Sequence, residues 1–432
     1  MDLEGMRAEL ADTELGHAVG RVVAVRGASL RLTLPGARLG ELVVIRRRGA
    51  PLTAEVIGFE RGEVLAVALG ELRGLGVDDV VERAGRALDV PFDQCLLGRV
   101  LDARGQPIDG APLATTHRRV PVYRAPPAPL ERAAVREVVS TGVRAVDALF
   151  TLGRGQRLGL FAGAGVGKSE LLAQLARGVE AEVVVVALVG ERGREVVEFL
   201  ERALSGEARR RAVVVVATSD APPLERICAA HTATAIAEGF RDDGRHVVLL
   251  VDSLTRLARA QREVGLAAGE PPGRRGYPPS AFSMLPRLLE RSGATRRGSI
   301  TAVYAVLTEG DDLEEPIADE VRGILDGHLV LSRRLAERGH FPAIDVGASL
   351  SRLLPSLATE PQLRAAARVR RWWAACEEKR DLIALGAYQR GTDSVVDEAL
   401  SRWARIERFL RQERGERVSY ADAVRELVSL AE

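Results

Sequence analysis

The sequence predicts an α/β protein with a parallel-sheet core, preceded by a small N-terminal β-barrel and followed by a C-terminal helical domain. Three observations predict this architecture. Short β-branched runs fill residues 19 to about 90, apolar runs alternate with helical periodicity from about 136 to 350, and helical periodicity dominates 361–432. Strands that alternate with helices indicate a parallel sheet covered on both faces, whereas clustered short strands indicate a barrel.

The barrel is predicted from β-branched runs that Gly, Pro and Arg turns separate. These runs cover residues 19–25, 29–34, 41–45, 54–59 and 63–69. Phe59 is the only aromatic residue among the first ninety. The region therefore offers almost no aromatic surface on which a nucleic-acid base could stack.

Residues 91–135 are predicted to form an ordered connector. Four prolines fall within residues 121–129, and proline suits neither a helix interior nor a central strand. We place the domain boundaries accordingly: 1–90 for the barrel, 91–355 for the α/β core with its connector, and 356–432 for the helical domain.

The core is predicted from apolar strands, each followed by a helical segment. The strands are RLGLFA (157–162), AEVVVVALVG (181–190), AVVVVATS (212–219), HVVLLVDS (246–253) and GSITAVYAVL (298–307).

Composition limits the class of protein. The chain has 432 residues, 46% hydrophobic and 28% charged, so it can bury a large core. Its 61 basic and 60 acidic residues leave a net charge of +1, which provides no overall basic field to attract nucleic acid or anionic lipid. No uncharged run approaches the ~18 residues of a membrane helix. The acidic start, MDLEGMRAEL, is unlike a signal peptide, so we expect a cytoplasmic protein.

Cysteine and histidine patterns point away from disulfides and metal clusters. The three cysteines, Cys95, Cys228 and Cys376, form no CxxC pair, so we expect buried reduced thiols. The histidines show no ligand spacing: His17, His117, His231, His246, His328 and His340. Only Lys168 and Lys379 among the 61 basic residues are lysines, so a retained lysine indicates a need for a compact ammonium group.

The segment AGAGVGKS (162–169) lies between a predicted strand and a predicted helix, which is the context of a phosphate-binding P-loop. Backbone N–H groups of such a loop curl around phosphate oxygens. Lys168 would contact the β- and γ-phosphates, and Ser169 would offer its hydroxyl to Mg²⁺. The strict pattern has glycine where this chain has Ala162, so only the relaxed form matches. The cradle comprises Gly163, Ala164, Gly165, Val166 and Gly167.

Two carboxylates complete the predicted site. Asp252 ends the strand HVVLLVD, as expected of a residue that holds Mg²⁺, although it could instead cap the following helix. Glu191, in GERGRE (190–195), ends a strand that we place beside the P-loop strand, where it could activate the attacking water. The alternative for Glu191 is a solvated charge in a charged loop.

These motifs together resemble the catalytic subunits of rotary ATP synthases and their export relatives, with a RecA-like P-loop core. The resemblance is closest to the type III secretion system ATPases, with the flagellar export ATPases as near twins. IADEVRGILDGH (317–328) looks more like the injectisome form, and alanine at position 162 is itself typical of the export branch. The matching segments are LGRVLDARGQPIDG (97–110), FAGAGVGKSELL (161–172), LVGERGREV (188–196), VDSLTRLARAQREVG (251–265), GEPPGRRGYPPSAFSMLPRLLERSG (269–293), 298–352 and GAYQRGTDSVVDEA (386–399).

The resemblance implies roles for further residues. Glu191 matches a water-activating glutamate, and Arg192 and Arg256 match arginines that contact the phosphates or stabilise the site. Arg352 matches an arginine finger that reaches a neighbouring subunit's nucleotide, with an ordinary surface ion pair as the alternative. Phe341 matches an aromatic residue that stacks on adenine, with packing inside the domain as its competitor.

The resemblance also implies a function and partners. It implies Mg²⁺-dependent ATP hydrolysis by a homohexameric ring that energises type III secretion through chaperone release, effector unfolding and export. Stator and central-stalk proteins and chaperone–effector complexes would be its partners, without nucleic acid. The ring would lie at the cytoplasmic face of the secretion apparatus, peripheral at the inner membrane. Its barrel would hold the ring together, and its helical domain would contact the stalk or chaperone–effector complexes.

Residues 269–279 would line the central pore and meet the stalk, although they could form only a rigid turn. Trp372 and Trp373 are predicted to pack between helices.

Three other functions are alternatives, and each would need a feature that this sequence lacks. A Rho-type RNA helicase would need aromatic stacking and basic charge that the N-terminal region lacks. A non-catalytic regulatory subunit would carry Gln where this chain has Glu191. A proton-driven synthase subunit would have a denser acidic loop than YQRGTDSVVDE (388–398).

Overall fold

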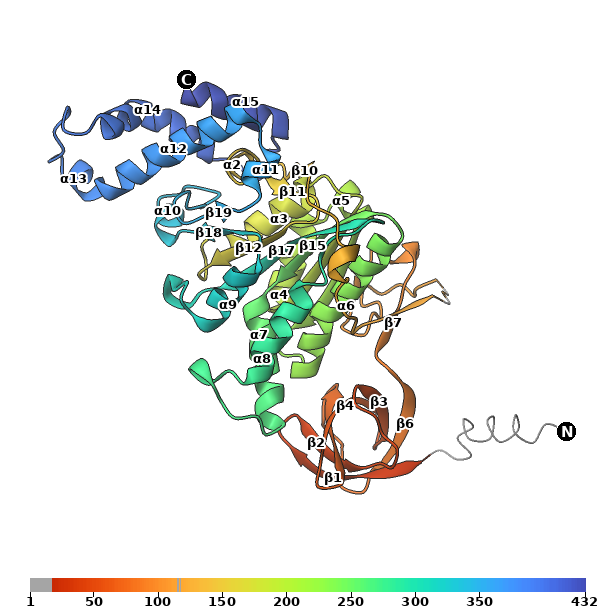
Figure 1. Ribbon diagram of the computed structural model, residues 1–432. Coiled ribbons are helices and arrows are strands. Elements are labelled where there is room, and N and C mark those ends of the chain that lie inside the picture. The colour runs from red at the N-terminus through yellow and green to blue at the C-terminus, as the bar shows by residue number, and fades with distance from the viewer. Residues whose placement is uncertain (1–17, 115, 117) are drawn as a thin grey trace.

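The computed structural model describes residues 18–114, 116 and 118–432. The expectation about the start of the chain, and those for His17 and His117, lie outside the described residues. The barrel lies at one end of an elongated molecule, the α/β core in the middle and the C-terminal helices at the other end (Figure 1). The fold class predicted from the sequence is confirmed.

The barrel closes in the strand order β1-β2-β5-β4-β3-β6. Its interior is filled by alternate Leu, Val and Ile side chains, such as Leu30, Leu32 and Ile45. The sixth strand was not predicted, because VVERAGRA contains glycine and three charged residues and shows little alternation. The strands are β1 (Val19–Arg26), β2 (Ser29–Thr33), β3 (Glu41–Arg46), β4 (Leu52–Glu60), β5 (Glu63–Leu69) and β6 (Val80–Ala87).

A second sheet forms the core, in the order β19-β18-β12-β17-β15-β13-β14-β8. Its strands are parallel except for β19, which pairs with β18, and β16, which pairs with β17. The strands are β8 (Val100–Leu101), β12 (Arg157–Ala162), β13 (Val183–Glu191), β14 (Ala212–Thr218), β15 (His246–Asp252), β16 (Gly293–Ala294), β17 (Ser299–Leu307), β18 (Gly327–Leu331) and β19 (Leu350–Ser351).

Both faces of this sheet are buried, which explains its uninterrupted valine runs. In β13, Val184 and Val186 face one hydrophobic core while Val183 and Val185 face the other. The helices that cover the faces include α2 (Arg144–Leu149), α3 (Lys168–Gly178), α4 (Gly193–Ala203), α5 (Glu207–Arg210), α6 (Pro223–Asp242), α7 (Leu254–Ala267), α8 (Pro279–Leu289), α9 (Pro316–Ile324) and α10 (Arg333–Glu337).

The connector is fixed to the core at several points. Its strand β8 joins the edge of the main sheet, and β7 (Asp89–Pro91) pairs with β9 (Arg119–Pro121). Arg291 donates a hydrogen bond to the carbonyl of Val122 and forms an ion pair with Glu238 in which both side chains are 1% exposed. The connector is therefore part of the packed core. Two-residue strands β10 (Val138–Val139) and β11 (Leu152–Gly153) follow it.

The C-terminal helices share one hydrophobic core with α2 and α3. Trp372 and Trp373 are 1% and 2% exposed, and Trp373 stacks on Trp403 with ring centroids 5.4 Å apart, so the predicted packing role is confirmed. The helices are α11 (Leu354–Leu357), α12 (Glu360–Glu378), α13 (Arg380–Ala384), α14 (Ser394–Leu410) and α15 (Tyr420–Ala431).

The cysteines differ from expectation at one position. All three are free, and Cys228 and Cys376 are buried, but Cys95 is only partly buried because it lies in a short 3₁₀ turn (Gln94–Leu96) at the molecular surface. Within the part of the chain that the structure describes, every helix is too short or too polar to cross a bilayer.

Candidate nucleotide site

The P-loop connects the end of β12 to the start of α3. Gly165 and Gly167 have φ angles of +79° and +97°, which glycine adopts without steric cost. Ala162 still belongs to β12, and it is absent from the described non-glycine residues with positive φ. A side chain is therefore tolerated at position 162, and the relaxed motif forms the same loop.

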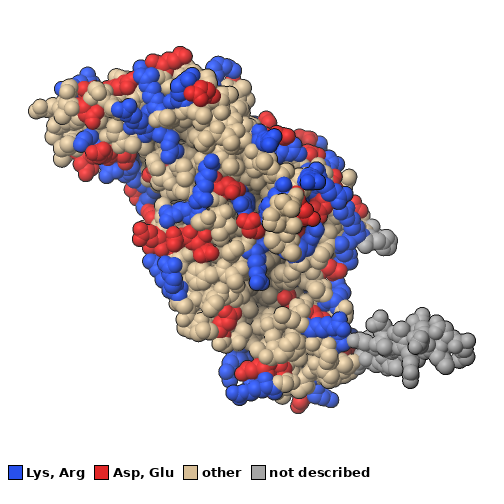
Figure 2. All heavy atoms as spheres, in the orientation of Figure 1, with Lys and Arg blue, Asp and Glu red and all other residues tan. Residues whose placement is uncertain are grey.

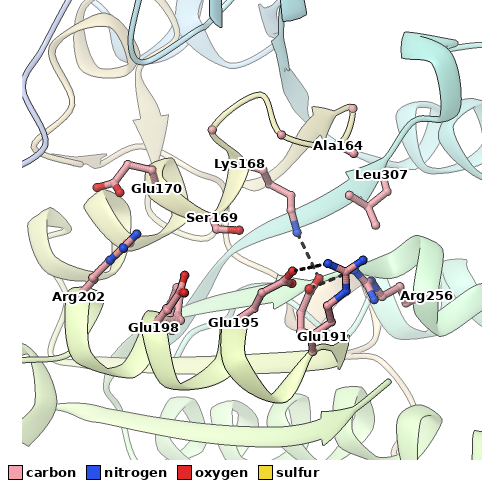
Figure 3. Close-up of a pocket in the computed structure, with 16 residues that line it drawn as sticks. Ala164, Lys168, Ser169, Glu170, Glu191, Glu195, Glu198, Arg202, Arg256 and Leu307 are labelled. Carbon is pink, nitrogen blue, oxygen red and sulfur yellow. Dashed lines mark hydrogen bonds and ion pairs between the residues drawn. The ribbon is translucent and has the colours of Figure 1, made fainter. Parts of the chain in front are cut away.

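The P-loop borders a cavity of about 430 Å³ at the carboxyl ends of the parallel strands, where α/β proteins bind ligands (Figure 3). The opposite wall is α4, whose charged side chains face Lys168 and Ser169 (Figure 3). The lining residues are Gly163, Ala164, Gly165, Gly167, Lys168, Ser169, Glu170, Ala173, Glu191, Arg192, Glu195, Glu198, Phe199, Arg202, Arg256 and Leu307.

Lys168 joins the P-loop to both predicted carboxylates. Its ammonium group forms an ion pair with Asp252 and lies 3.4 Å from Oε1 of Glu191. The three side chains are each less than 10% exposed. Low solvent exposure strengthens such interactions, because water screens them less.

One detail of the prediction for Glu191 is wrong. Its strand β13 does not lie beside the P-loop strand β12, since β15 and β17 intervene. The carboxylate still reaches the site, since Oε1 of Glu191 lies 3.4 Å from the Lys168 ammonium group (Figure 3).

The environment of Glu191 mixes opposing effects. Burial raises the pKa of its carboxyl to about 7, the neighbouring Glu195 and Asp252 act in the same direction, and Lys168 and Arg256 oppose them. Arg256 Nη2 lies 3.1 Å from Glu191 Oε2. The Nε atom of Arg256 is buried and has no hydrogen-bond partner among the described residues. A carboxyl with a pKa near neutrality suits proton transfer.

Arg192 lines the P-loop cavity, whereas Phe341 is not among the described residues that line it. Arg192 is largely exposed on the cavity rim, 3.6 Å from Glu195. Phe341 is 39% exposed, and its ring lies only 3.2 Å from where a Cβ on Gly167 would stand. Phe341 borders a different cavity, which residues 411–416 also line. The ring of Phe341 is therefore partly exposed beside Gly167 and is not packed in the interior of the domain.

Arg352 is not among the described residues that line the P-loop cavity. It follows β19, is exposed, and donates a 3.4 Å hydrogen bond to the carbonyl of Arg322. The structure therefore brings Lys168, Ser169, Glu191 and Asp252 together but leaves Arg352 at a separate surface.

Several lining residues were not predicted, chiefly Glu195, Glu198 and Arg202. All three lie on α4, and Glu195 follows Glu191 by four residues. The clue in the sequence was the spacing of these three residues, 195, 198 and 202, which places them on one face of α4.

The oxygen ligands present fit a magnesium ion. Mg²⁺ is usually held by one or two carboxylates together with substrate phosphates rather than by a cage of protein ligands. Asp252 and the hydroxyl of Ser169 would supply oxygen ligands, and Asp252 forms an ion pair with Lys168. No cluster of three or more His, Cys, Asp or Glu residues suitable for a metal occurs within the described ranges.

A P-loop on a parallel sheet, with a lysine held between two strand-end carboxylates, defines a P-loop ATPase. The sequence matches the ATP synthase alpha/beta family in its nucleotide-binding domain (residues 142–351) and beta-barrel domain (18–85), and the T3SS EscN ATPase C-terminal domain (358–429). The chain belongs to the ATP synthase alpha/beta family and is an ATPase of its type III secretion and flagellar branch.

Relatives match over almost the whole chain. A "Type 3 secretion system ATPase" of Xanthomonas euvesicatoria is 48% identical over 99% of this chain and 97% of its own length. A "Flagellum-specific ATP synthase" of Treponema pallidum is 49% identical over 98% of this chain and 95% of its own. This coverage does not fit the alternative of a Rho-type helicase.

Solved structures agree with this assignment. The assembled ATPase EscN from the type III secretion system of enteropathogenic E. coli superimposes with a TM-score of 0.91 at 43% identity, covering 96% of this chain and 100% of that chain. EscN in complex with its central stalk EscO gives a TM-score of 0.88 at 42% identity, with the same coverage.

Proposed function

We propose that this protein hydrolyses ATP with Mg²⁺ to drive type III protein export, in an injectisome rather than a flagellum. The single observation that carries the catalytic part is the position of the Lys168 ammonium group between Asp252 and Glu191. Relatives of both kinds are about equally similar to the whole chain, so the choice of an injectisome depends on the segment 317–328, which looks more like the injectisome form.

The proposed chemistry follows from the positions of the side chains. The amides of 163–167 and Lys168 bind the phosphates, while Ser169 and Asp252 would hold Mg²⁺, which when bound would neutralise phosphate charge. Glu191 accepts a proton from the attacking water, because its carboxyl lies beside Lys168 at the cavity wall. Arg256 orients the Glu191 carboxylate, and Arg192 contacts the phosphates from the rim.

The proposed active unit is a homohexamer. Arg352 lies outside its own chain's cavity, so we assign it to the nucleotide of the adjacent subunit. The structure of "the assembled ATPase EscN" supports assembly, and its complex "with its central stalk EscO" supports a stalk partner. We further propose contacts with stator proteins and chaperone–effector complexes, and a peripheral position at the cytoplasmic face of the inner membrane.

The domain roles are proposed with the boundaries given above. Residues 1–90 hold the ring together, 91–355 bind and hydrolyse ATP, and 356–432 contact the stalk or chaperone–effector complexes. Both signs of charge are interspersed on the face that Figure 2 displays. This distribution does not favour a nucleic-acid partner at that face.

The experiment compares three variants of the full chain for ATP turnover and for binding of a fluorescent ATP analogue. Glu191→Gln should lower kcat by about 10²–10⁴-fold, the usual contribution of a general base, with affinity nearly unchanged. Lys168→Ala should lose both ATP turnover and affinity for the analogue. Glu198→Gln is the matched control, since Glu198 lines the same cavity outside the lysine's ion pairs. Wild-type turnover by Glu191→Gln would contradict the proposal.

A further inference from the structure

The outer side of the P-loop is held by an arginine that the nucleotide site does not use. Arg333, at the start of α10, donates from Nη1 to the carbonyl oxygen of Ala164 at 3.2 Å. Its Nε lies 3.1 Å from Oδ2 of Asp311. A P-loop turns its backbone amides toward the phosphate. A donor that binds one of its carbonyl oxygens, as Arg333 does, therefore contacts the side of the loop that faces away from the phosphate. Arg333 is absent from the described residues that line the cavity.

The Asp311–Arg333 pair, called the clasp below, lies directly against the P-loop backbone. A Cβ on Gly163 would stand 2.2 Å from Asp311 Oδ1 and 2.7 Å from Arg333 Nη2. The segment that carries Asp311 is also attached to the loop's base, since the amide of Thr308 donates to the carbonyl of Ala162 at 3.1 Å. A movement of residues 308–312 would therefore move the P-loop.

The same segment is tied to the loop 269–279. Arg275 Nη2 lies 3.0 Å from Oδ2 of Asp312, the residue next to the clasp. Arg275 and Asp311 have φ angles of +48° and +60°, and they are two of the four described non-glycine residues with positive φ. Such conformations persist only where surrounding contacts hold them, and they concentrate at functional sites.

We propose that the clasp positions the P-loop for phosphate binding, and that the Arg275–Asp312 pair transmits the position of loop 269–279 to it. This inference rests on the proposed function, since it assigns the P-loop to ATP. Arg333 is a positioning residue that touches only the outside of the loop. Arg333 and Asp311 are about 40% exposed, so each contact is weak and easily shifted. Displacement of loop 269–279 would therefore shift the P-loop and change nucleotide affinity severalfold.

The test measures KM and kcat for ATP in the full-length chain, with the unfolding midpoint of every variant. Arg333→Ala should raise KM about three- to tenfold and leave kcat within twofold. The reason is that a preorganised P-loop binds phosphates alike in the ground state and the transition state. Arg333→Lys keeps a donor for the carbonyl and should restore part of the affinity. Arg364→Ala, which removes an exposed pair with Glu360, is the control and should change neither constant.

The transmission is tested by combining variants. Arg275→Ala should raise KM in the same direction by a smaller factor, and should add nothing in the Arg333→Ala background, because residues in one network are not additive. An unchanged KM in Arg333→Ala overturns the clasp, and additive effects of Arg275→Ala overturn the transmission. The proposed function fails separately, through wild-type turnover by Glu191→Gln.

Discussion

Lys168 Nζ lies 3.4 Å from Glu191 Oε1, which places a buried cation against a carboxyl whose pKa is raised to about 7 by burial. The lysine favours the ionised carboxylate, whereas burial, Glu195 and Asp252 favour the protonated form. These opposing effects together hold the pKa of the Glu191 carboxyl above its usual range. The same lysine is proposed to bind phosphate, so substrate binding and the ionisation of the base are linked.

The first prediction is an acidic limb in the pH dependence of turnover. Glu191 accepts a proton only when it is ionised, and the pH dependence of kcat/KM reports the pKa of this group in the free enzyme. We therefore expect kcat/KM to fall tenfold per pH unit below about pH 7. The limb of kcat should lie at lower pH, because bound Mg²⁺ would stabilise the carboxylate. Initial rates from pH 5.5 to 9 would measure both. A kcat/KM that is level down to pH 5.5 would contradict the assignment.

The second prediction is that Phe341 stacks on the adenine base of ATP. Phe341→Ala should raise KM for ATP by about tenfold, since stacking of a base on an aromatic ring contributes ~1–3 kcal/mol. Phe341→Trp should keep KM near wild type. Phe59→Ala, at a ring 56% exposed on the barrel, is the control. Equal KM values for Phe341→Ala and wild type would show that the ring does not contact the nucleotide.

The third prediction concerns the buried ion pair beneath the connector. Arg291→Met should destabilise the fold by about 3–5 kcal/mol, because it leaves the buried Glu238 with only the more distant and partly exposed Arg124, at 3.7 Å, as a cation. Adding Glu238→Leu should recover part of this loss, since the uncompensated charge is then removed. The midpoint of thermal unfolding measures both, with Arg364→Ala as an exposed-pair control expected to change little. If Arg291→Met alone is as stable as wild type, the ion pair does not have this role.

Much of the fold and the site could be predicted from the sequence because their signals are local. The P-loop, the strand that ends in Asp252 and the valine runs each occupy a few consecutive residues. The order of the strands could not be predicted, since β13 and β15 are equally apolar on both faces and either could pair with β12. Strand β6 was missed for lack of alternation. The contact of Arg333 with Ala164 was missed because it joins residues 169 apart through tertiary packing.

The last prediction is that Arg352 acts on the nucleotide of the neighbouring subunit. Its guanidinium donates to the carbonyl of Arg322 in its own chain, and it is exposed, which leaves it able to reach another molecule. An arginine that meets the transition state from a second subunit contributes about 10³–10⁵ in rate. Arg352→Ala should therefore bind nucleotide and assemble normally while losing most of its turnover.

Mixing two inactive variants gives the sharpest form of this test. Arg352→Ala supplies an intact P-loop and Lys168→Ala supplies an intact Arg352, so some interfaces of a mixed ring combine both working parts. Part of the activity should return on mixing, in proportion to those interfaces. Arg364→Ala mixed with Lys168→Ala is the matched control for dilution of inactive subunits. If subunit exchange is verified by fluorescence energy transfer and the mixture stays as inactive as its parents, Arg352 does not act between subunits.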